Sequence, residues 1–442
     1  MDIIQNTGPK SERDPRDGLI RLGIVSAVGG VLIGVIGAYF RYALELSTQW
    51  LLTVIEWAHQ FPVWGWWIPL LIGAFGAGIA RLMVRGTPLA SGSGVQHVEA
   101  VMRGEATPAP FRVLPIKFFG GILALGSGLA LGREGPTVQM GATIGQALVK
   151  RCKMGGDDLE DVQAALAGAG LAVAFNAPMG GSIFVFEEVA RRFRLRLVLA
   201  TLIGGSMAVA VSRLIMGDAP VFIVSNILAP TFASLIPYFI FGITLGYLGV
   251  LYNRAVIRSM DIFASLKKIP LELRAALVGA IVGLIGWFAP NLIGGGEGFS
   301  QVVLNGGLPL GMLLITFVVR WFLGPFSYSA GTPGGLFAPL LLVGAAYGAL
   351  FAGGVDVLLP GLGLPAVSFA IVGMAAFFSA VVRAPLTGII LIVEMTATTG
   401  LLVPMLLASF AAVLTATFLG GPPIYDTLRE RMLAAQKARP QV

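Results

Sequence analysis

Charged residues are scarce in this chain of 442 residues. They make up 12% of the sequence, against about 25% in soluble domains, while hydrophobic residues make up 56% and the mean hydropathy is +0.84. Most of the chain must therefore lie in lipid or in a lipid-covered core. Several uncharged stretches, such as residues 219–253 and 322–355, exceed the roughly 20 residues that a helix needs to cross a bilayer. The sequence predicts an all-α protein with many membrane helices.

Cysteine and histidine are scarcer still. The single cysteine, Cys152, excludes an intrachain disulfide, and the two histidines, His59 and His97, form no His-Glu-x-x-His motif. An intramembrane serine hydrolase is the alternative from another class, because Ser93 and His97 lie four residues apart and would share one face of a helix. Such an enzyme also needs an orienting group and an oxyanion hole. We expect no enzymatic activity, no metal and no cofactor.

Acidic residues are fewer than basic ones, which gives a net charge of +7. The basic residues flank apolar segments instead of forming a soluble basic module, so we expect a lipid bilayer and no nucleic acid as the partner. No secretory signal is predicted in residues 1–21, which are polar and charged. Basic residues before the first span and after the last place both termini in the cytoplasm by the positive-inside rule: Lys10, Arg13, Arg16, Arg21, Arg429, Arg431, Lys437 and Arg439.

The chain contains an internal repeat. Segments that start Ala-Pro at Ala177 and Ala384 lie 207 positions apart, and each leads at the same offset to an acid, Glu187 or Glu394. These two acids are expected to cap or pair in the same way. Two further pairs have offsets of 204 and 203: Gly92-Ser93-Gly94 with Gly296-Glu297-Gly298, and the Gly-x-x-x-Pro frames starting at Gly132 and Gly335.

The repeat predicts one membrane domain, residues 19–437, with a cytoplasmic segment before it (1–18) and a short tail after it (438–442). Its halves are residues 19–215 and 228–420, and we expect them to be inverted. Duplication of this kind is typical of transporters that bind their substrate near the middle of the membrane.

Each repeated motif joins glycine, and often proline, to the start of an apolar helix. Proline fits the first helical turn and glycine allows close backbone approach, which predicts helices that begin inside the membrane. Their first N–H groups have no intrahelical partner, so several such ends pointing at one place would bind an anion. The alternative is that the glycines only permit tight helix packing, which explains most single glycines in membrane helices. The three repeated motifs together favour the anion site.

Four motifs, in this order, resemble those of the CLC family of chloride channels and proton-coupled chloride transporters. They are Gly92-Ser93-Gly94-Val95, Gly132-Arg133-Glu134-Gly135-Pro136, Gly335-Leu336-Phe337-Ala338-Pro339 and the late Tyr425. The resemblance covers residues 20–437. It implies a CLC-type fold of broken helices that meet near the midplane, a homodimer with a separate pathway in each subunit, and a prokaryotic member in the inner membrane without a cytoplasmic regulatory domain.

The resemblance also implies roles for individual residues. Ser93 and Tyr425 would coordinate chloride through their hydroxyls, and the backbone amides of Leu336 and Phe337 would donate to it. Glu134 would be the gate and the outer proton acceptor, because its carboxylate carries the charge of chloride and accepts the same donors until it is protonated. Arg133 has two interpretations, an electropositive wall of the pathway or an ion-paired or snorkelling arginine.

Glu188 distinguishes an exchanger from a channel. By the resemblance it matches the inner proton-transfer glutamate, which CLC channels typically lack, so we expect a proton-coupled chloride antiporter; the alternative is a passive chloride channel gated by Glu134. Adjacent residues on a helix point about 100° apart, so the side chain of Glu187 cannot share a face with that of Glu188 and must have different neighbours. A structural explanation for Glu188 is a surface acid paired with Arg191 or Arg192 at a helix end.

By the resemblance, the serine at position 93 indicates which anion is transported. In the family, serine at this position generally goes with chloride and proline with nitrate, and the arginine of the Glu134 motif argues against the fluoride branch. The first motif departs from the family pattern at Gln96, where proline is usual, and at His97, where an acid is common, which puts the local helix start in question. We expect His97 to be a satisfied polar residue and Glu99 to be ion-paired.

Overall fold

A computed structural model describes residues 15–224, 227 and 235–437. The predicted N-terminal segment thus lies mostly outside the described residues, and the predicted tail 438–442 lies wholly outside them. Within the described part the chain is helical and contains no strand, which confirms the all-α prediction.

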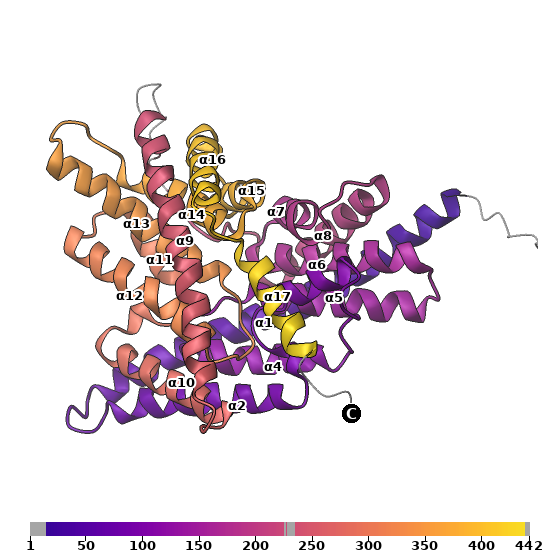
Figure 1. Ribbon diagram of the computed structural model, residues 1–442, viewed down its shortest axis with the longest axis horizontal. Helices are drawn as coiled ribbons and strands as arrows, with labels where there is room; N and C mark the ends of the chain where they lie inside the picture. The colour runs from indigo at the N-terminus through magenta and orange to yellow at the C-terminus, as the bar shows by residue number, and fades with distance from the viewer. Residues whose placement is uncertain (1–14, 225–226, 228–234, 438–442) are drawn as a thin grey trace, which may run out of the picture.

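The helices of the first half are α1 (Pro15–Ala58), α2 (Trp67–Arg85), α3 (Val95–Met102), α4 (Val113–Gly126), α5 (Glu134–Arg151), α6 (Gly156–Phe175), α7 (Pro178–Phe184) and α8 (Leu195–Met216). Those of the second half are α9 (Leu235–Ser265), α10 (Leu271–Phe288), α11 (Glu297–Asn305), α12 (Leu310–Tyr328), α13 (Phe337–Leu358), α14 (Ala366–Val382), α15 (Pro385–Thr396) and α16 (Leu402–Phe418). The last helix, α17 (Ile424–Lys437), crosses in front of both halves in Figure 1.

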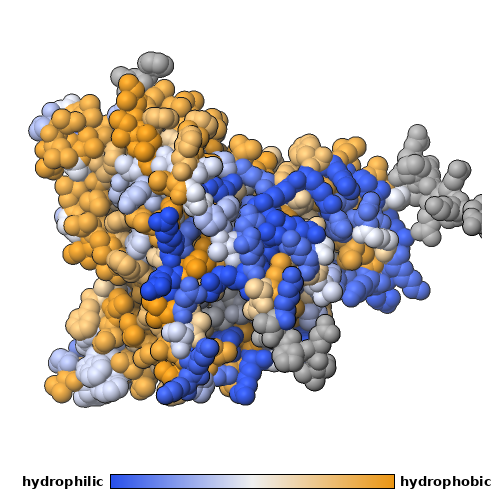
Figure 2. Space-filling model, in the orientation of Figure 1, coloured by the Kyte–Doolittle hydropathy of each residue, from blue (hydrophilic) through white to orange (hydrophobic). Residues whose placement is uncertain are grey.

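Seven of the described helices are long and apolar enough to cross a membrane: α1, α2, α8, α9, α10, α12 and α13. Four shorter helices, α4, α14, α15 and α16, are also apolar. In Figure 2, hydrophobic surface covers the region of α12, α13 and the upper part of α9, whereas hydrophilic surface gathers over the lower part of α9, over α17 and over the neighbouring α5, α6 and α8. This distribution agrees with a membrane protein that presents one polar face to water.

The order of the helices repeats, because each of α1–α8 has a counterpart eight helices later. α1 packs on α8 as α9 packs on α16, and α5 packs on α6 as α13 packs on α14. Equivalent helices also meet across the two halves, α2 against α10 and α7 against α15. The halves therefore associate through like elements, as in a two-fold arrangement.

Some glycines serve only this packing. A Cβ atom at Gly73 of α2 would collide with the carbonyl of Gly279 in α10, and the reverse also holds. The same mutual contact joins Gly344 of α13 to Gly373 of α14. At these positions the packing interpretation is correct, since the two helix backbones touch.

The repeated acids Glu187 and Glu394 cap each other's repeat. Glu187 accepts hydrogen bonds of 3.1 and 2.7 Å from the amides of Leu386 and Thr387 at the start of α15. Glu394 accepts bonds of 3.1 and 2.7 Å from the amides of Met179 and Gly180 at the start of α7. The expectation that both acids cap or pair alike is confirmed, and the caps tie the two halves together.

The structure corrects the register of one repeated motif. α3 begins after Gly94, which has a left-handed φ of 91°, and α11 begins after Gly296, with a φ of 95°. Gly94 is thus the counterpart of Gly296, and pairing Gly92 with Gly296 was wrong by two residues. The counterpart of Ser93 is then Gly295, so the motif supplies its hydroxyl in one half only.

Candidate functional site

Three loops that precede helices are joined by backbone hydrogen bonds. Gly132, before α5, exchanges two bonds of 2.8 and 2.7 Å with Gly335, before α13. The amide of Gly92, before α3, donates to Thr332 at 3.0 Å, and the amide of Gly334 donates back to Gly92 at 3.1 Å. The N-termini of α3, α5 and α13 therefore meet inside the protein, as predicted from the glycine motifs, and their dipoles point to a common place.

Proline lies in the first turn of both helices that follow the Gly-x-x-x-Pro frames. Pro136 is the third residue of α5 and Pro339 the third of α13, and both are buried. Here the missing N–H of proline breaks no helical hydrogen bond, because the first turn has none to lose.

Glu134 is the first residue of α5 and is completely buried. Its Oε1 atom accepts a 2.6 Å hydrogen bond from the amide of Ala338 in the first turn of α13. The carboxylate folds back over Gly132, where a Cβ atom would collide with both of its oxygens. The acid is thus held at the N-terminus of another helix, in a position where that terminus would otherwise attract a free anion.

Ser93 and Tyr425 lie beside this point, and both are completely buried. Their hydroxyls are close together, yet within the described residues neither makes a hydrogen bond of normal geometry. Ser93 also contacts Gly135, since a Cβ atom there would collide with the serine hydroxyl. Other buried hydroxyls of the described residues, such as that of Tyr252, also lack a partner, but these two lie together where helix N-termini meet, and an anion there would satisfy both.

The start of α13 completes this group. Leu336 and Phe337 are its N-cap and first residue, and both are completely buried. The ring of Phe337 lies 6.0 Å from that of Tyr425, measured between centroids. The structure therefore brings together all four residues predicted to bind the anion, while the amide that holds Glu134 belongs to the next residue, Ala338.

Lys117 of α4 was not identified from the sequence. Its completely buried ammonium donates to the carbonyls of Gly92 and Ser93 at 2.6 and 3.0 Å. The lysine therefore holds the first motif from behind through these two carbonyls. Its signal was a single cation inside the apolar segment 113–126, because an ionisable residue in such a segment marks function by default.

The departure from the family pattern at Gln96 does not displace the helix. Gln96 is the second residue of α3, and its Oε1 atom accepts a 3.1 Å bond from the amide of Gly94. Ser93 precedes the helix, so the expectation that it shares a helical face with His97 is wrong. The ring of His97 is buried and lies beside the backbone of Thr107, as expected for a polar residue inside the protein.

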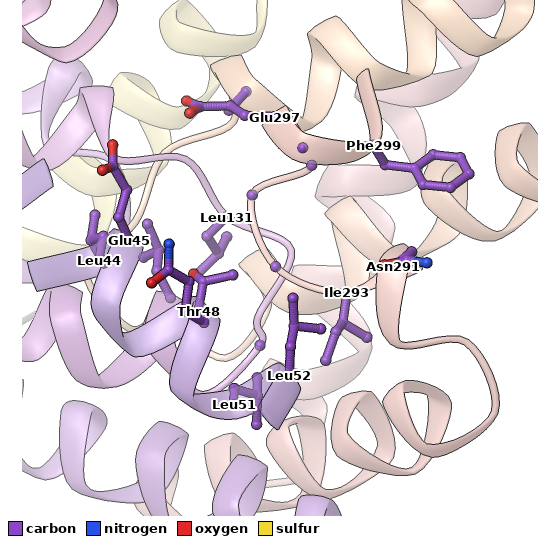
Figure 3. A pocket seen from close by; sticks show the side chains of 18 of the residues that line it. Leu44, Glu45, Thr48, Leu51, Leu52, Leu131, Asn291, Ile293, Glu297 and Phe299 are labelled. Carbon is purple, nitrogen blue, oxygen red and sulfur yellow. The ribbon is translucent and has the colours of Figure 1, made fainter. Parts of the chain in front are cut away.

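Arg133 is ion-paired. Its side chain is 6% exposed, forms a 3.0 Å salt bridge with Glu297 of α11 and donates from Nε to Ala174 at 3.0 Å. A cavity of about 450 Å³ opens beside this pair. Figure 3 shows Glu45 and Glu297 on one side of the cavity and apolar residues such as Leu51 on the other.

This cavity reaches the surroundings of Glu134. Its lining includes Gly132, which lies against the Glu134 carboxylate, and Arg133, which precedes Glu134 in the chain. It also includes Ala338, whose amide donates a hydrogen bond to Glu134. The cavity thus comes next to the buried acid, although Glu134 itself does not line it. We refer to this space as the outer cavity.

Glu188 lies elsewhere, in the π-helical turn Val185–Val189 that follows α7. Its side chain is only 2% exposed, and its Oε2 atom pairs with Arg191 at 3.2 Å. The interpretation as a surface acid is therefore wrong, although the predicted pairing with Arg191 is present. Arg192 pairs instead with Glu160.

Glu99 of α3 lies beside Glu188 and is completely buried. Within the described residues it forms no ion pair, and neither of its oxygens has a hydrogen bond of normal geometry. The expectation that Glu99 is ion-paired is therefore wrong. Two carboxyl groups side by side in a buried place disfavour a double negative charge, so one of them carries a proton more readily.

Comparison with known proteins identifies relatives of this arrangement. The sequence model of a family described as voltage gated chloride channel matches residues 75–417. The H+/Cl− exchange transporter ClcA of Vibrio cholerae is 39% identical over 428 residues, which cover 94% of this chain and 91% of that protein. The crystal structure of a slow cyanobacterial Cl−/H+ antiporter has a TM-score of 0.89 and 34% identity, with 94% of this chain and 99% of that one covered. A eukaryotic CLC transporter at 22% identity shares the fold, with a TM-score of 0.80 over 93% of this chain and 74% of that one.

Proposed function

The chain belongs to the voltage-gated chloride channel (CLC) family, and from this premise we propose that it exchanges chloride for protons across a membrane. The observation that supports this most directly is the Glu134 carboxylate. It is buried, bound to a helix N-terminus, and adjacent to two hydroxyls that have no partner within the described residues. An acid in that position can exchange places with an anion and can also carry a proton.

In this proposal chloride binds between Ser93, Tyr425 and the first amides of α13, at Leu336 and Phe337. These donors are neutral, so the anion is held by helix dipoles and hydroxyls and can leave again. Lys117 holds the first motif from behind through the two carbonyls that it binds. Chloride is the expected anion because serine at the position of Ser93 generally goes with chloride in the CLC family.

The carboxylate of Glu134 competes with chloride for the same region. When ionised, it occupies the α13 N-terminus through Ala338. When it takes up a proton, it loses its charge and most of its attraction to the amide, so it leaves and an anion can enter. A single side chain thereby links the movement of one proton to that of chloride.

Protons reach Glu134 from two sides in this proposal. The outer cavity comes next to it on one side. Glu188 passes protons from the opposite, cytoplasmic side, where the polar surface around α17 gathers. We further propose that both termini are cytoplasmic, that the protein is a homodimer in a bacterial inner membrane, and that it is a transporter without enzymatic activity.

Purified protein in liposomes tests the exchange. With a chloride gradient and no initial pH difference, the antiporter should move protons in the direction opposite to chloride and so build up a pH difference, which a pH electrode detects when no protonophore is present. Chloride flux measured in parallel with an ion-selective electrode gives the coupling ratio. Passive chloride flux without proton movement would refute the exchange and support the channel alternative.

A further inference from the structure

Arg191 occupies an unusual position at the inner end of the proposed proton path. It lies two residues after the π-helical turn that carries Glu188, beyond Ala190, and its backbone is left-handed with a φ of 49°. A residue other than glycine rarely adopts this conformation, and such strain commonly marks functional positions. The turned backbone brings the guanidinium back over Glu188 at 3.2 Å.

The guanidinium covers the acid from the solvent side. The side chain of Arg191 is 39% exposed, whereas that of Glu188 is 2% exposed. Water from the cytoplasm therefore meets the cation before it meets the carboxylate. One oxygen of Glu188, Oε1, has no hydrogen-bond partner among the described residues, so the acid is paired on one side only.

The same nitrogen of Arg191 is shared with a second acid. Its Nη2 atom lies 3.2 Å from Asp426 of α17 and 3.2 Å from Glu188. Asp426 is held independently by Arg103 of α3 at 2.8 Å and by Arg429 at 3.2 Å. The guanidinium of Arg191 therefore bridges two carboxylates at equal distances, one held by two other arginines and one buried.

This sharing joins the two transport paths. Asp426 directly follows Tyr425, whose hydroxyl lies at the proposed anion site, and α3 packs on both α17 and the π-helical turn. A shift of the guanidinium toward Asp426 would uncover Glu188, and a shift toward Glu188 would stabilise its ionised form, because a nearby cation favours the charged carboxylate.

We propose that Arg191 is a positioning residue that moves between Glu188 and Asp426 and thereby controls proton uptake by Glu188 from the cytoplasm. This inference rests on the proposed antiport. The proton comes from hydronium or a buffer acid in the cytoplasm and forms a new O–H bond on the carboxylate of Glu188, while Arg191 stays protonated and pairs with Asp426. Release of the proton toward Glu134 restores the charge of Glu188 and attracts the cation again.

Other charged groups around Glu188 affect the same equilibrium. Glu99 of α3 lies against it, and Asp426 of α17 faces it through Arg191. Both acids favour a proton on Glu188, and Arg191 opposes it. Changes to Arg191 and to Asp426 should therefore have opposite signs, which a merely structural tie would not produce.

Proteoliposomes with fixed external pH and varied internal pH test this. In Arg191→Ala, the internal pH at which proton flux is half-maximal should rise by about one unit or more, because the cation no longer favours the ionised acid. In Asp426→Asn it should fall, because Arg191 then pairs with Glu188 alone. Arg192→Ala, which removes the neighbouring pair with Glu160, is the matched control and should leave the profile unchanged.

An infrared titration makes the test independent of which step limits the rate. The C=O band of protonated Glu188, assigned by its loss in Glu188→Gln, should shift its midpoint in the same opposite directions. If Arg191→Ala is not monodisperse in detergent, Arg191→Gln, which keeps hydrogen bonding but not charge, takes its place. Midpoints that match the control in both variants, or that move in one direction together, would overturn the proposal. Absence of coupling in the unchanged protein would instead refute the antiport itself.

Discussion

Glu134 and Glu188 are both buried glutamates, but different kinds of group hold them. Glu134 accepts a hydrogen bond from a backbone amide at the start of α13. Glu188 pairs with the guanidinium of Arg191. A helix N-terminus binds any suitable anion, so Glu134 can be replaced there by chloride. A guanidinium carries a full charge, so it acts mainly on whether Glu188 is ionised.

The arginines near the two acids also differ, both in how exposed they are and in how they are paired. Arg133, beside Glu134, is 6% exposed and is held by Glu297 and by a backbone carbonyl. Arg191 is 39% exposed and is shared between two acids. A buried and fully bonded arginine is fixed, whereas a partly exposed and shared one can move. In the proposed mechanism the outer acid therefore moves its own side chain, whereas the inner acid depends on movement of its partner.

The largest effect is expected for Glu134→Gln. The neutral amide can neither carry a proton nor mimic chloride, so proton movement should fall to background and chloride flux should persist without its dependence on pH. Parallel proton and chloride flux measurements in liposomes give both quantities. Glu394→Gln, which alters another carboxylate at a helix N-terminus, is the control and should keep the coupling ratio. Proton pumping that survives in Glu134→Gln would exclude it as the meeting point of the two paths.

Glu188→Gln should separate the two acids. Proton movement should again fall to background, because the inner end of the path is broken. Chloride flux should keep its dependence on external pH, because Glu134 is still present to be protonated from the outer cavity. The measurement is chloride flux over a series of external pH values. Equal pH profiles for Glu134→Gln and Glu188→Gln would show that the two acids do not have the different roles assigned here.

Gly132→Ala should weaken the outer acid without removing it. The added methyl group would collide with the Glu134 carboxylate, which must leave its place over α13. The number of protons moved per chloride should drop several-fold, less than in Glu134→Gln. Gly86→Ala is the control, because a Cβ atom there meets nothing within 4 Å. A coupling ratio unchanged in a folded Gly132→Ala protein would mean that the observed position of the carboxylate is not the working one.

The smallest effect is expected for the reciprocal caps, which hold helix N-termini as Glu134 does but lie far from the hydroxyls of the anion site. Glu187→Gln and Glu394→Gln should each lower the free energy of unfolding by about 1 kcal/mol, since each weakens a charged cap of one helix. Thermal unfolding in detergent, followed by intrinsic fluorescence, measures both. The loss should be somewhat larger for Glu187→Gln, because Glu187 also accepts a 2.7 Å hydrogen bond from the hydroxyl of Thr387, and a loss in only one of the two variants would argue against equivalent roles in the two halves.

Much of the site could be predicted from the sequence because its signals are local. Glycine and proline at the start of apolar segments mark helix termini, and an acid between glycines in an apolar region is costly enough to require a function. This is why Glu134 and the start of α13 could be identified. The register of the first motif could not, because glycine is abundant and both Gly92 and Gly94 have a positive φ, so only the start of α3 directly after Gly94 distinguishes them.

The groups that the sequence did not reveal depend on long-range contacts. Arg133 and Glu297 are far apart in the chain, as are Arg191 and Asp426. Their pairing follows from how α11 and α17 pack, which no local pattern specifies. For the same reason Glu99 was expected to have a cation as its partner, whereas the fold places it beside another acid.

The backbone bridge between Gly132 and Gly335 has an evolutionary consequence. Its hydrogen bonds use only main-chain atoms, so they are indifferent to the side chains around them. A lineage can therefore exchange residues such as Ser93, Gln96 or Arg191, to which we assign roles in anion binding and proton coupling only by proposal, while the helix termini stay where they are. New transport properties can in this way arise by single substitutions on an inherited scaffold.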